Sequence, residues 1–140
     1  MNHANDGINW DERHQLPIHD QPLGTIELDG TGGPMRQSVA LDPTGDFRLE
    51  TLYEPGESET LVVSLHGAQD RSRFAIPRFE WRRTLSRVEA GKLYLSDSTL
   101  ALSRNLEIGW YVGSNSIDLI EASAEHIIGV AKSCGYSRIV

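Results

Sequence analysis

The amino-acid sequence predicts an α/β protein in which antiparallel N-terminal strands lead into a partial parallel sheet with crossover helices. Residues 23–59 contain short segments of alternating apolar and polar residues, divided by clusters of Gly, Pro and Asp, a pattern typical of antiparallel strands. From residue 60 onward the order becomes strand, helix, strand, helix, strand, and this alternation indicates a parallel sheet. We therefore expect one domain over residues 23–140, with a β-rich part at 23–59 and a β-α-β-α-β part at 60–140.

Residues 1–22 form a polar segment ahead of this domain, and we expect a loosely ordered N-terminal arm there. The segment contains two isolated apolar anchors, Trp10 and Ile18, but no apolar run that would form a signal peptide. Its three histidines follow no metal-binding spacing: His3, His14 and His19. We assign no role to them.

Three strands are expected in the β-rich part, each bounded by turn residues. They span residues 25–28, 37–41 and 47–53. Turn clusters follow them at residues 29–34, 42–45 and 54–56. Because these segments mix apolar and polar side chains, we expect them to pair as antiparallel edge strands.

The central strand of the parallel part is the segment 61–65. It is an apolar run interrupted only by Ser64, which is typical of a strand covered on both faces. A helix is expected over 77–90 and would end at Gly91; its apolar stripe consists of Phe79, Trp81, Leu85 and Val88. A second buried strand follows at 92–97.

A long amphipathic helix is expected before the last strand. Either Ser114 or Ser116 would cap its start, and Gly135 would end it. Its predicted buried face consists of Ile117, Ile120, Ala124, Ile127, Ile128 and Ala131. The last strand begins at residues 137–140. Since two helices cover a parallel sheet incompletely, we expect some apolar surface to stay exposed.

The overall charge limits the classes of partner. With a net charge of -7 and a pI near 5.1, the protein should not bind nucleic acid or an anionic membrane through bulk electrostatics. The single cysteine, Cys134, excludes an intrachain disulfide and fits a cytoplasmic location. No stretch has the roughly 20 apolar residues that a membrane-spanning helix needs.

The candidate site residues follow the two buried strands of the parallel part. Ligands bind beyond the carboxyl ends of parallel strands, and four residues come directly after the central strand: His66, Gly67, Ala68 and Gln69. A glycine at such a place lets the backbone turn sharply and direct N–H groups at an anion. Asp97, at the end of the next strand, would either bind substrate hydroxyls or cap the following turn.

Other aromatic and histidine residues have structural as well as functional interpretations. His66 would either shape a binding loop or simply end a strand with hydrogen bonds to nearby backbone. Trp110 and Tyr111 would either line a sugar-binding surface or pack in the core. His126 falls among Ile and Ala on the long helix, where a hydrogen-bonded or exposed histidine is the expectation.

The chain from residue 61 to residue 140 resembles the N-terminal half of the α/β-hydrolases. It is most similar to bacterial serine esterase-like proteins found near surface-polysaccharide and glycosyltransferase genes. Four segments carry this resemblance in order: Leu65-His66-Gly67-Ala68, Arg78-Phe79-Glu80-Trp81, Leu93-Tyr94-Leu95-Ser96-Asp97, and Gly109-Trp110-Tyr111-Val112-Gly113-Ser114. The resemblance covers a little over half of the chain.

The resemblance implies that residues 66–69 form the oxyanion loop of an esterase. In this family the nucleophile lies in a Gly-x-Ser-x-Gly turn, after the strand that here begins at Ile139, and the acid and the histidine follow it. The sequence contains no such turn; Gly56-Glu57-Ser58-Glu59-Thr60 lacks the final glycine and precedes a strand. The resemblance therefore implies a truncated α/β-hydrolase-like domain with no catalytic residue, metal or cofactor of its own.

The expected function is that of a fragment of an α/β-hydrolase-like protein, inactive alone. Its parent would hydrolyse or transfer acyl esters, with glycans as substrates, and a second chain would complete the fold. An alternative is a non-catalytic module that binds carbohydrate or a partner protein. A further alternative is a complete small α/β domain unrelated to hydrolases, because a fold does not fix a function. Neither nucleic acid nor a membrane is expected as a partner.

Overall fold

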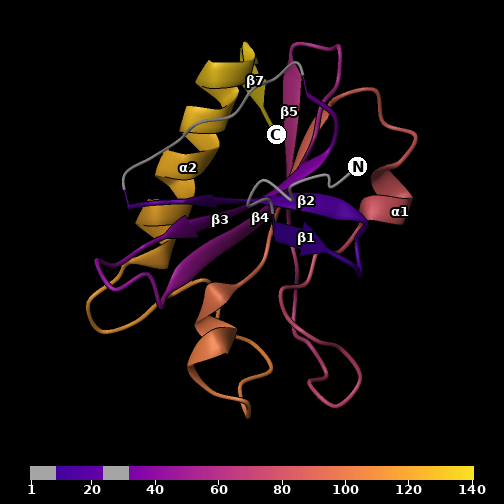
Figure 1. Cartoon of the computed structure of the whole chain (residues 1–140). Coiled ribbons are helices and arrows are strands. Elements are labelled where there is room, and N and C mark those ends of the chain that lie inside the picture. The colour runs from indigo at the N-terminus through magenta and orange to yellow at the C-terminus, as the bar shows by residue number, and fades with distance from the viewer. Residues whose placement is uncertain (1–8, 24–31) are drawn as a thin grey trace, which may run out of the picture.

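The computed structural model describes residues 9–23 and 32–140, which form one mixed sheet with a helix on either side (Figure 1). Its strands are β1 (Asn9–Asp11), β2 (Leu16–Gln21), β3 (Met35–Ala40), β4 (Arg48–Glu54), β5 (Thr60–Leu65), β6 (Gly91–Leu95) and β7 (Arg138–Ile139). Its helices are α1 (Arg82–Leu85), the 3-10 helix η1 (Ser98–Leu102) and α2 (Leu119–Cys134). The strand predicted at 25–28 lies outside the described residues.

The strands of the described part are ordered β1-β2-β3-β4-β6-β5-β7 in the sheet. Strands β3, β4 and β6 pair antiparallel, whereas β6, β5 and β7 run parallel to one another. The prediction of an α/β fold, with antiparallel strands leading into parallel ones, is confirmed at this level. However, β3 and β4 lie inside the sheet and not at its edge, because β2 pairs with β3 on the outer side.

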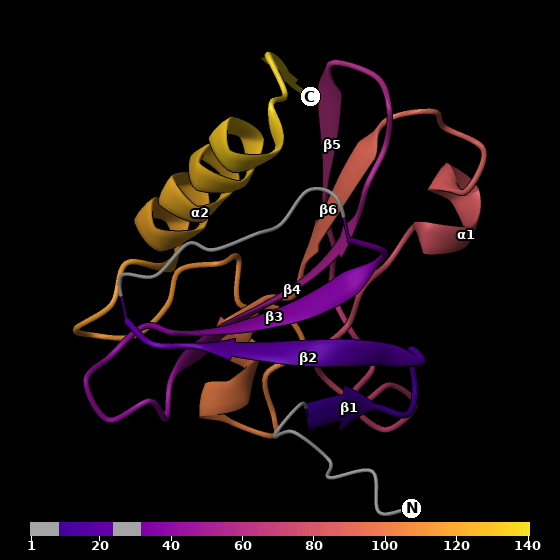
Figure 2. The ribbon, with the colours of Figure 1, turned by 45° about the horizontal axis from the view of Figure 1, so that its top comes forward.

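The two faces of the sheet carry different side chains because successive residues of a strand point to opposite sides. One face is apolar from β3 to β5 and packs against α2; its cluster contains Val39, Leu49, Tyr53, Leu61, Leu93, Leu119 and Val130. The other face holds a smaller apolar cluster: Leu16, Leu52, Phe79 and Tyr94. Figure 2 shows α2 and α1 on opposite sides of the sheet, in agreement with these two clusters.

Residues 9–21 form strands β1 and β2, so the expectation of a loosely ordered arm is wrong for this stretch. The cause is an ion-pair network on the second face of the sheet. The Asp11 carboxylate accepts hydrogen bonds from His14 at 2.7 Å and from Arg36 of β3 at 2.8 Å, and Arg36 also pairs with Glu50. Burial by itself would raise the pKa of Asp11, but the bonds from His14 and Arg36 lower it to about 2.

The helix predicted over 77–90 is wrong in extent, since only the single turn Arg82–Leu85 is helical. Trp81 interrupts the helix because it takes a left-handed conformation, with φ at 71°. Of the predicted stripe, Phe79 is buried against Leu52 and Tyr94, whereas Trp81 and Val88 are exposed. The buried ring of Phe79 and the partly buried Leu85 of α1 therefore fix this segment on the sheet.

The long helix α2 is capped by neither predicted serine, since its cap lies four residues after Ser114 and two after Ser116. The Asp118 side chain caps it by accepting a hydrogen bond from the Glu121 amide at 3.0 Å, and Gly135 ends it at φ 77° as predicted. Its buried face consists of Leu119, Ser123, His126, Val130 and Ala131. The predicted face is confirmed at Ala131 and at Ile127, which packs against the core, but it is wrong at Ile120, Ala124 and Ile128, which are exposed.

Tyr136 connects the C-terminal end of the chain to the middle of the sheet. Its hydroxyl group lies 2.7 Å from that of Tyr53 and accepts a hydrogen bond from the Gly56 amide at 3.2 Å. A Cβ atom on Gly91 would lie 2.1 Å from this hydroxyl, so only glycine fits beside the ring. Burial and the bond to Tyr136 raise the pKa of Tyr53 well above its usual value.

Candidate functional site

The loop after β5 contains the predicted site residues His66, Gly67, Ala68 and Gln69. His66 is only 7% exposed, and both of its ring nitrogens have partners. Its Nε2 accepts a hydrogen bond from the Asp97 amide at 2.8 Å, and its Nδ1 lies 2.8 Å from the Gly67 carbonyl oxygen, to which it donates. The ring thus joins the carboxyl ends of β5 and β6, which agrees with the structural interpretation of this histidine.

Asp97 lies beneath this edge and faces away from solvent. It is 2% exposed, and its carboxylate accepts hydrogen bonds from the backbone amides of Thr99, Gly109 and Tyr111 at 3.0–3.2 Å. Since these bonds use both carboxylate oxygens, Asp97 fixes the loop 97–111. This supports the capping interpretation and leaves no exposed oxygen for a substrate hydroxyl.

Tyr111 and Trp110 lie together on this loop but have opposite surroundings. The Tyr111 hydroxyl accepts from the His66 amide at 2.9 Å and donates to the Leu95 carbonyl oxygen at 3.0 Å. Burial raises the pKa of Tyr111. Trp110 is 73% exposed, so core packing does not explain it. Both residues take the left-handed conformation, with φ at 55° and 56°, which costs roughly 1–2 kcal/mol per residue.

Gly67 and Ala68 form the exposed part of the loop. A Cβ atom on Gly67 would meet no atom within 4 Å, and its φ is not positive, so the fold does not require glycine there. This differs from the expectation that glycine permits a sharp turn. The position is open on its outer side, which a ligand can approach.

Glu80 is a site residue that the sequence analysis did not single out. Its carboxylate accepts hydrogen bonds from the Gln69 side-chain amide at 2.8 Å and from the Gly67 amide at 3.4 Å, and Arg78 lies 3.7 Å away. The loop amide that would hold an oxyanion therefore faces a carboxylate. Glu80 stands in one of the segments that resemble the hydrolases, but no pattern in the sequence indicates this contact.

A small pocket of about 220 Å³ lies at the carboxyl end of β6, where Ser96, Asp97 and Ser98 line it. Its lining combines polar residues, among them Arg48, Glu50, Asp97 and Ser98, with Ile76, Pro77 and Ala101. The Ser98 hydroxyl is buried without a hydrogen-bond partner among the described residues. The possible bases among the described lining residues are the carboxylates of Asp46, Glu50 and Asp97, and the Ser98 hydroxyl is hydrogen-bonded to none of them.

The described residues contain no group of three or more His, Cys, Asp or Glu side chains arranged to hold a metal ion. None of the helices in residues 9–23 and 32–140 has the length and apolar content needed to cross a membrane. A cytoplasmic location stays a prediction from the cysteine content. The arrangement around Gly67 offers backbone amides for an anion, but the described residues assemble no nucleophile and base.

Comparisons of the chain with models of protein families, with curated proteins and with solved structures found no match.

Proposed function

We propose that the chain is part of an α/β-hydrolase-like esterase, in which residues 66–69 form the oxyanion loop. The observation that carries this proposal is the parallel pairing of β5 with β7, where Leu61 lies beside Ile139. In this class of enzyme one oxyanion donor follows the nucleophile and the other comes from a different loop. The two donors meet at one oxygen only if their strands are neighbours with carboxyl ends at the same edge.

The donors from this chain would be the amides of Gly67 and Ala68. Such a donor contributes about 3 kcal/mol to transition-state stabilisation in acyl transfer. The Gly67 amide already faces an anionic oxygen, that of Glu80, at 3.4 Å, which supports its capacity to face an oxyanion. Glu80 is partly exposed and would have to rotate away when an ester binds. Residues 1–140 alone should therefore be inactive, since no nucleophile turn is among them.

The substrate class that we propose is an acylated glycan. Trp110 is exposed at the same edge of the sheet as Gly67, and an exposed indole ring presents an apolar face to which a sugar ring can bind. Tyr111 and Asp97 hold the backbone beside Trp110 in position. The ester would then lie near the loop while the sugar contacts the indole.

The first experiment is to sequence the DNA on the 3′ side of codon 140 and to translate it in all three frames. We expect a Gly-x-Ser-x-Gly turn shortly after the strand that contains Ile139. If one is found, the longer protein should react with a fluorophosphonate probe, whereas residues 1–140 should not. If no frame encodes the turn, the esterase proposal is wrong.

A pair of glycine variants tests the loop in that longer protein. Gly67→Val places a branched side chain in the open space outside the loop and should lower kcat/KM for an acetyl ester by about tenfold or more. Gly33→Val is the matched control, because a side chain there also meets no atom within 4 Å and the residue lies away from the loop. Equal activity of the two variants would contradict the assignment of residues 66–69.

The second candidate function is a non-catalytic module that binds a partner protein. The exposed apolar residues of the C-terminal part favour it: Ile139 and Val140 are exposed at β7, and Ile120 and Ile128 are exposed on α2. Multi-angle light scattering distinguishes the two cases. A monodisperse monomer at high concentration would argue against an obligate partner, whereas a stable complex with a second chain would support one.

A further inference from the structure

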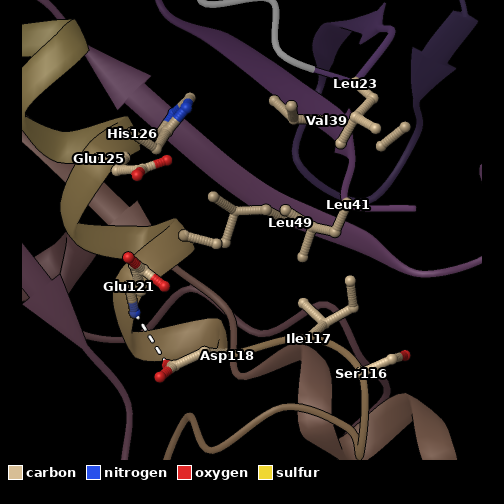
Figure 3. A pocket seen from close by; sticks show the side chains of 12 residues that line it. Leu23, Val39, Leu41, Leu49, Ser116, Ile117, Asp118, Glu121, Glu125 and His126 are labelled. Carbon is tan, nitrogen blue, oxygen red and sulfur yellow. Dashed lines mark hydrogen bonds between the residues drawn. The ribbon is translucent and has the colours of Figure 1, made fainter. Parts of the chain in front are cut away.

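A second pocket lies away from the loop, between the N-terminal half of α2 and strands β3 and β4 (Figure 3). Its volume is about 420 Å³, within the range of small-molecule sites. Apolar side chains form its floor: Val39, Leu41, Leu49 and Ile117. The feature that separates it from an ordinary surface hollow is a histidine in its lining.

His126 of α2 lines this pocket and is 3% exposed. Neither ring nitrogen has a hydrogen-bond partner among the described residues. Burial lowers the pKa of His126 to about 4, so the ring is neutral at pH 7 and has one N–H group and one lone pair. A buried polar group without a partner costs roughly 1–3 kcal/mol, which a ligand atom bonded to the ring would recover.

The charged side chains that line the described part of the pocket are all acidic. Asp118, Glu121 and Glu125 line it, and none of the described lining residues is basic. Asp118 already accepts the amide of Glu121, so this end of α2 has its capping anion. Glu121 and Glu125 are exposed and one helical turn apart, and Figure 3 shows both at the side of the pocket formed by α2. This charge pattern disfavours an anion and favours a cation.

We propose that this pocket binds a small organic amine in its protonated form, with a compact apolar body such as a phenyl ring. The apolar body would contact Val39, Leu41 and Leu49. The ammonium group would lie near Glu121 and Glu125 and donate a hydrogen bond to the lone pair of the neutral His126 ring. The site does not depend on the esterase proposal, because it shares no lining residue with the loop 66–69.

The primary test is an NMR titration of the isotopically labelled 140-residue chain at pH 7 with three probes of similar size. They are 2-phenylethylamine, 3-phenylpropionate and 2-phenylethanol, which carry positive, negative and no charge. We expect the amine to shift the ring signals of His126 and the methyl signals of Val39 and Leu49. Its affinity should exceed that of the carboxylate by about tenfold. Equal or tighter binding of the carboxylate, or no shift at His126 with millimolar amine, would overturn the proposal.

Two variants separate the contributions of the ring and of the charge. His126→Leu removes the lone pair while keeping a side chain of similar volume, and it should weaken amine binding. Glu125→Gln removes one exposed charge without disturbing the core and should weaken the amine by about two- to fivefold.

Glu57→Gln is the matched control for the charge, because Glu57 is exposed and lies far from this pocket in the β4–β5 connection. It should leave the affinity unchanged. If Glu125→Gln and Glu57→Gln bind the amine equally well, the acidic side chains do not select the ligand and the proposal is wrong. This comparison holds even if His126→Leu fails to fold.

Discussion

Asp97 and His126 are polar side chains of nearly equal burial in two different regions, and their surroundings are opposite. Asp97, at the carboxyl end of β6, is 2% exposed and accepts hydrogen bonds from three backbone amides. His126, on α2, is 3% exposed and has no hydrogen-bond partner for either ring nitrogen among the described residues. Burial alone therefore does not show whether a polar side chain has its hydrogen-bond partners.

The difference shows that the hydrogen bonds of a buried polar group indicate its role better than its burial does. A buried carboxylate with every oxygen bonded stabilises the loop that surrounds it and has nothing left to offer a ligand. A buried imidazole with both nitrogens unbonded lowers stability, and a bound partner would restore the missing bonds. From the sequence, Asp97 was expected either to bind substrate hydroxyls or to cap a turn, and His126 was expected to be hydrogen-bonded or exposed. The geometry supports the capping role of Asp97, whereas His126 is buried without a partner among the described residues.

The largest expected effect comes from Asp97→Ala. It leaves the amides of Thr99, Gly109 and Tyr111 without their acceptor in a buried place, so the free energy of unfolding should fall by about 4 kcal/mol. Denaturant unfolding followed by tryptophan fluorescence measures it. Asp97→Asn keeps one acceptor oxygen and should lose about half as much. A loss below about 1 kcal/mol for the alanine variant would refute the structural role.

The next effect is the acid sensitivity that His126 causes. Its pKa is lowered to about 4, so the unfolded chain binds a proton more readily than the folded one. The free energy of unfolding is therefore unaffected by this ring above about pH 6.5. It should fall by about 3 kcal/mol in total as the pH is lowered from 6.5 toward 4. Urea unfolding at several pH values measures this slope.

His126→Leu should remove that slope between pH 6.5 and 4 and leave the other titrating groups in place. Burial also lowers the pKa of His14, so this residue contributes a slope of the same sign in both chains. Asp11, with a pKa of about 2, acts only below about pH 4. Identical slopes in the wild-type and variant chains would contradict the assignment of a buried neutral ring to His126.

A smaller effect is expected for Gly109→Ala, which disturbs the amides around Asp97 without removing the carboxylate. The added methyl group would lie 2.5 Å from the Thr99 Cβ and 2.8 Å from the Asp97 Oδ2. Such overpacking should cost about 2 kcal/mol in the free energy of unfolding. A variant as stable as the wild type, measured by thermal unfolding, would show that the loop relaxes around Asp97 more easily than its bonds indicate.

The smallest effect is expected for Gly67→Ala in the exposed loop. The new methyl group meets no atom within 4 Å and the φ is not positive, so the free energy of unfolding should stay within about 0.5 kcal/mol of the wild type. The same thermal unfolding measurement as for Gly109→Ala checks it. A destabilisation comparable to that of Gly109→Ala would mean that Gly67 is structural and not part of an open binding loop.

The strands with local signals could be predicted from the sequence. The alternation and turn residues around β3 and β4, the apolar run of β5 and the glycine after α2 are encoded in neighbouring residues. The hydrogen bonds between the His66 ring and nearby backbone were also among the predicted alternatives, because a histidine at a strand end has backbone groups close by. These features depend on short-range chemistry.

The predictions that were wrong concern features that depend on contacts between residues far apart in the sequence. Strands β1 and β2 are held by Asp11 and Arg36, whose pairing spans 25 residues and has no periodic signature. The buried face predicted for α2 was partly wrong because apolar content favoured Ile120 and Ile128, whereas the sheet accepts Leu119 and Val130. That His126 has no partner among the described residues could not be predicted either, because the surroundings of a buried side chain depend on the whole fold.

The contact between Tyr53 and Tyr136 has a consequence for the time course of folding. The two hydroxyl groups meet across 83 residues of chain, and the Gly56 amide joins them across 80. Closing such a large loop costs entropy before the contact yields any stabilisation, so the C-terminal helix and strand should dock late. We therefore expect slow folding, in milliseconds to seconds, during which the sheet edge that receives β7 is open to other strands.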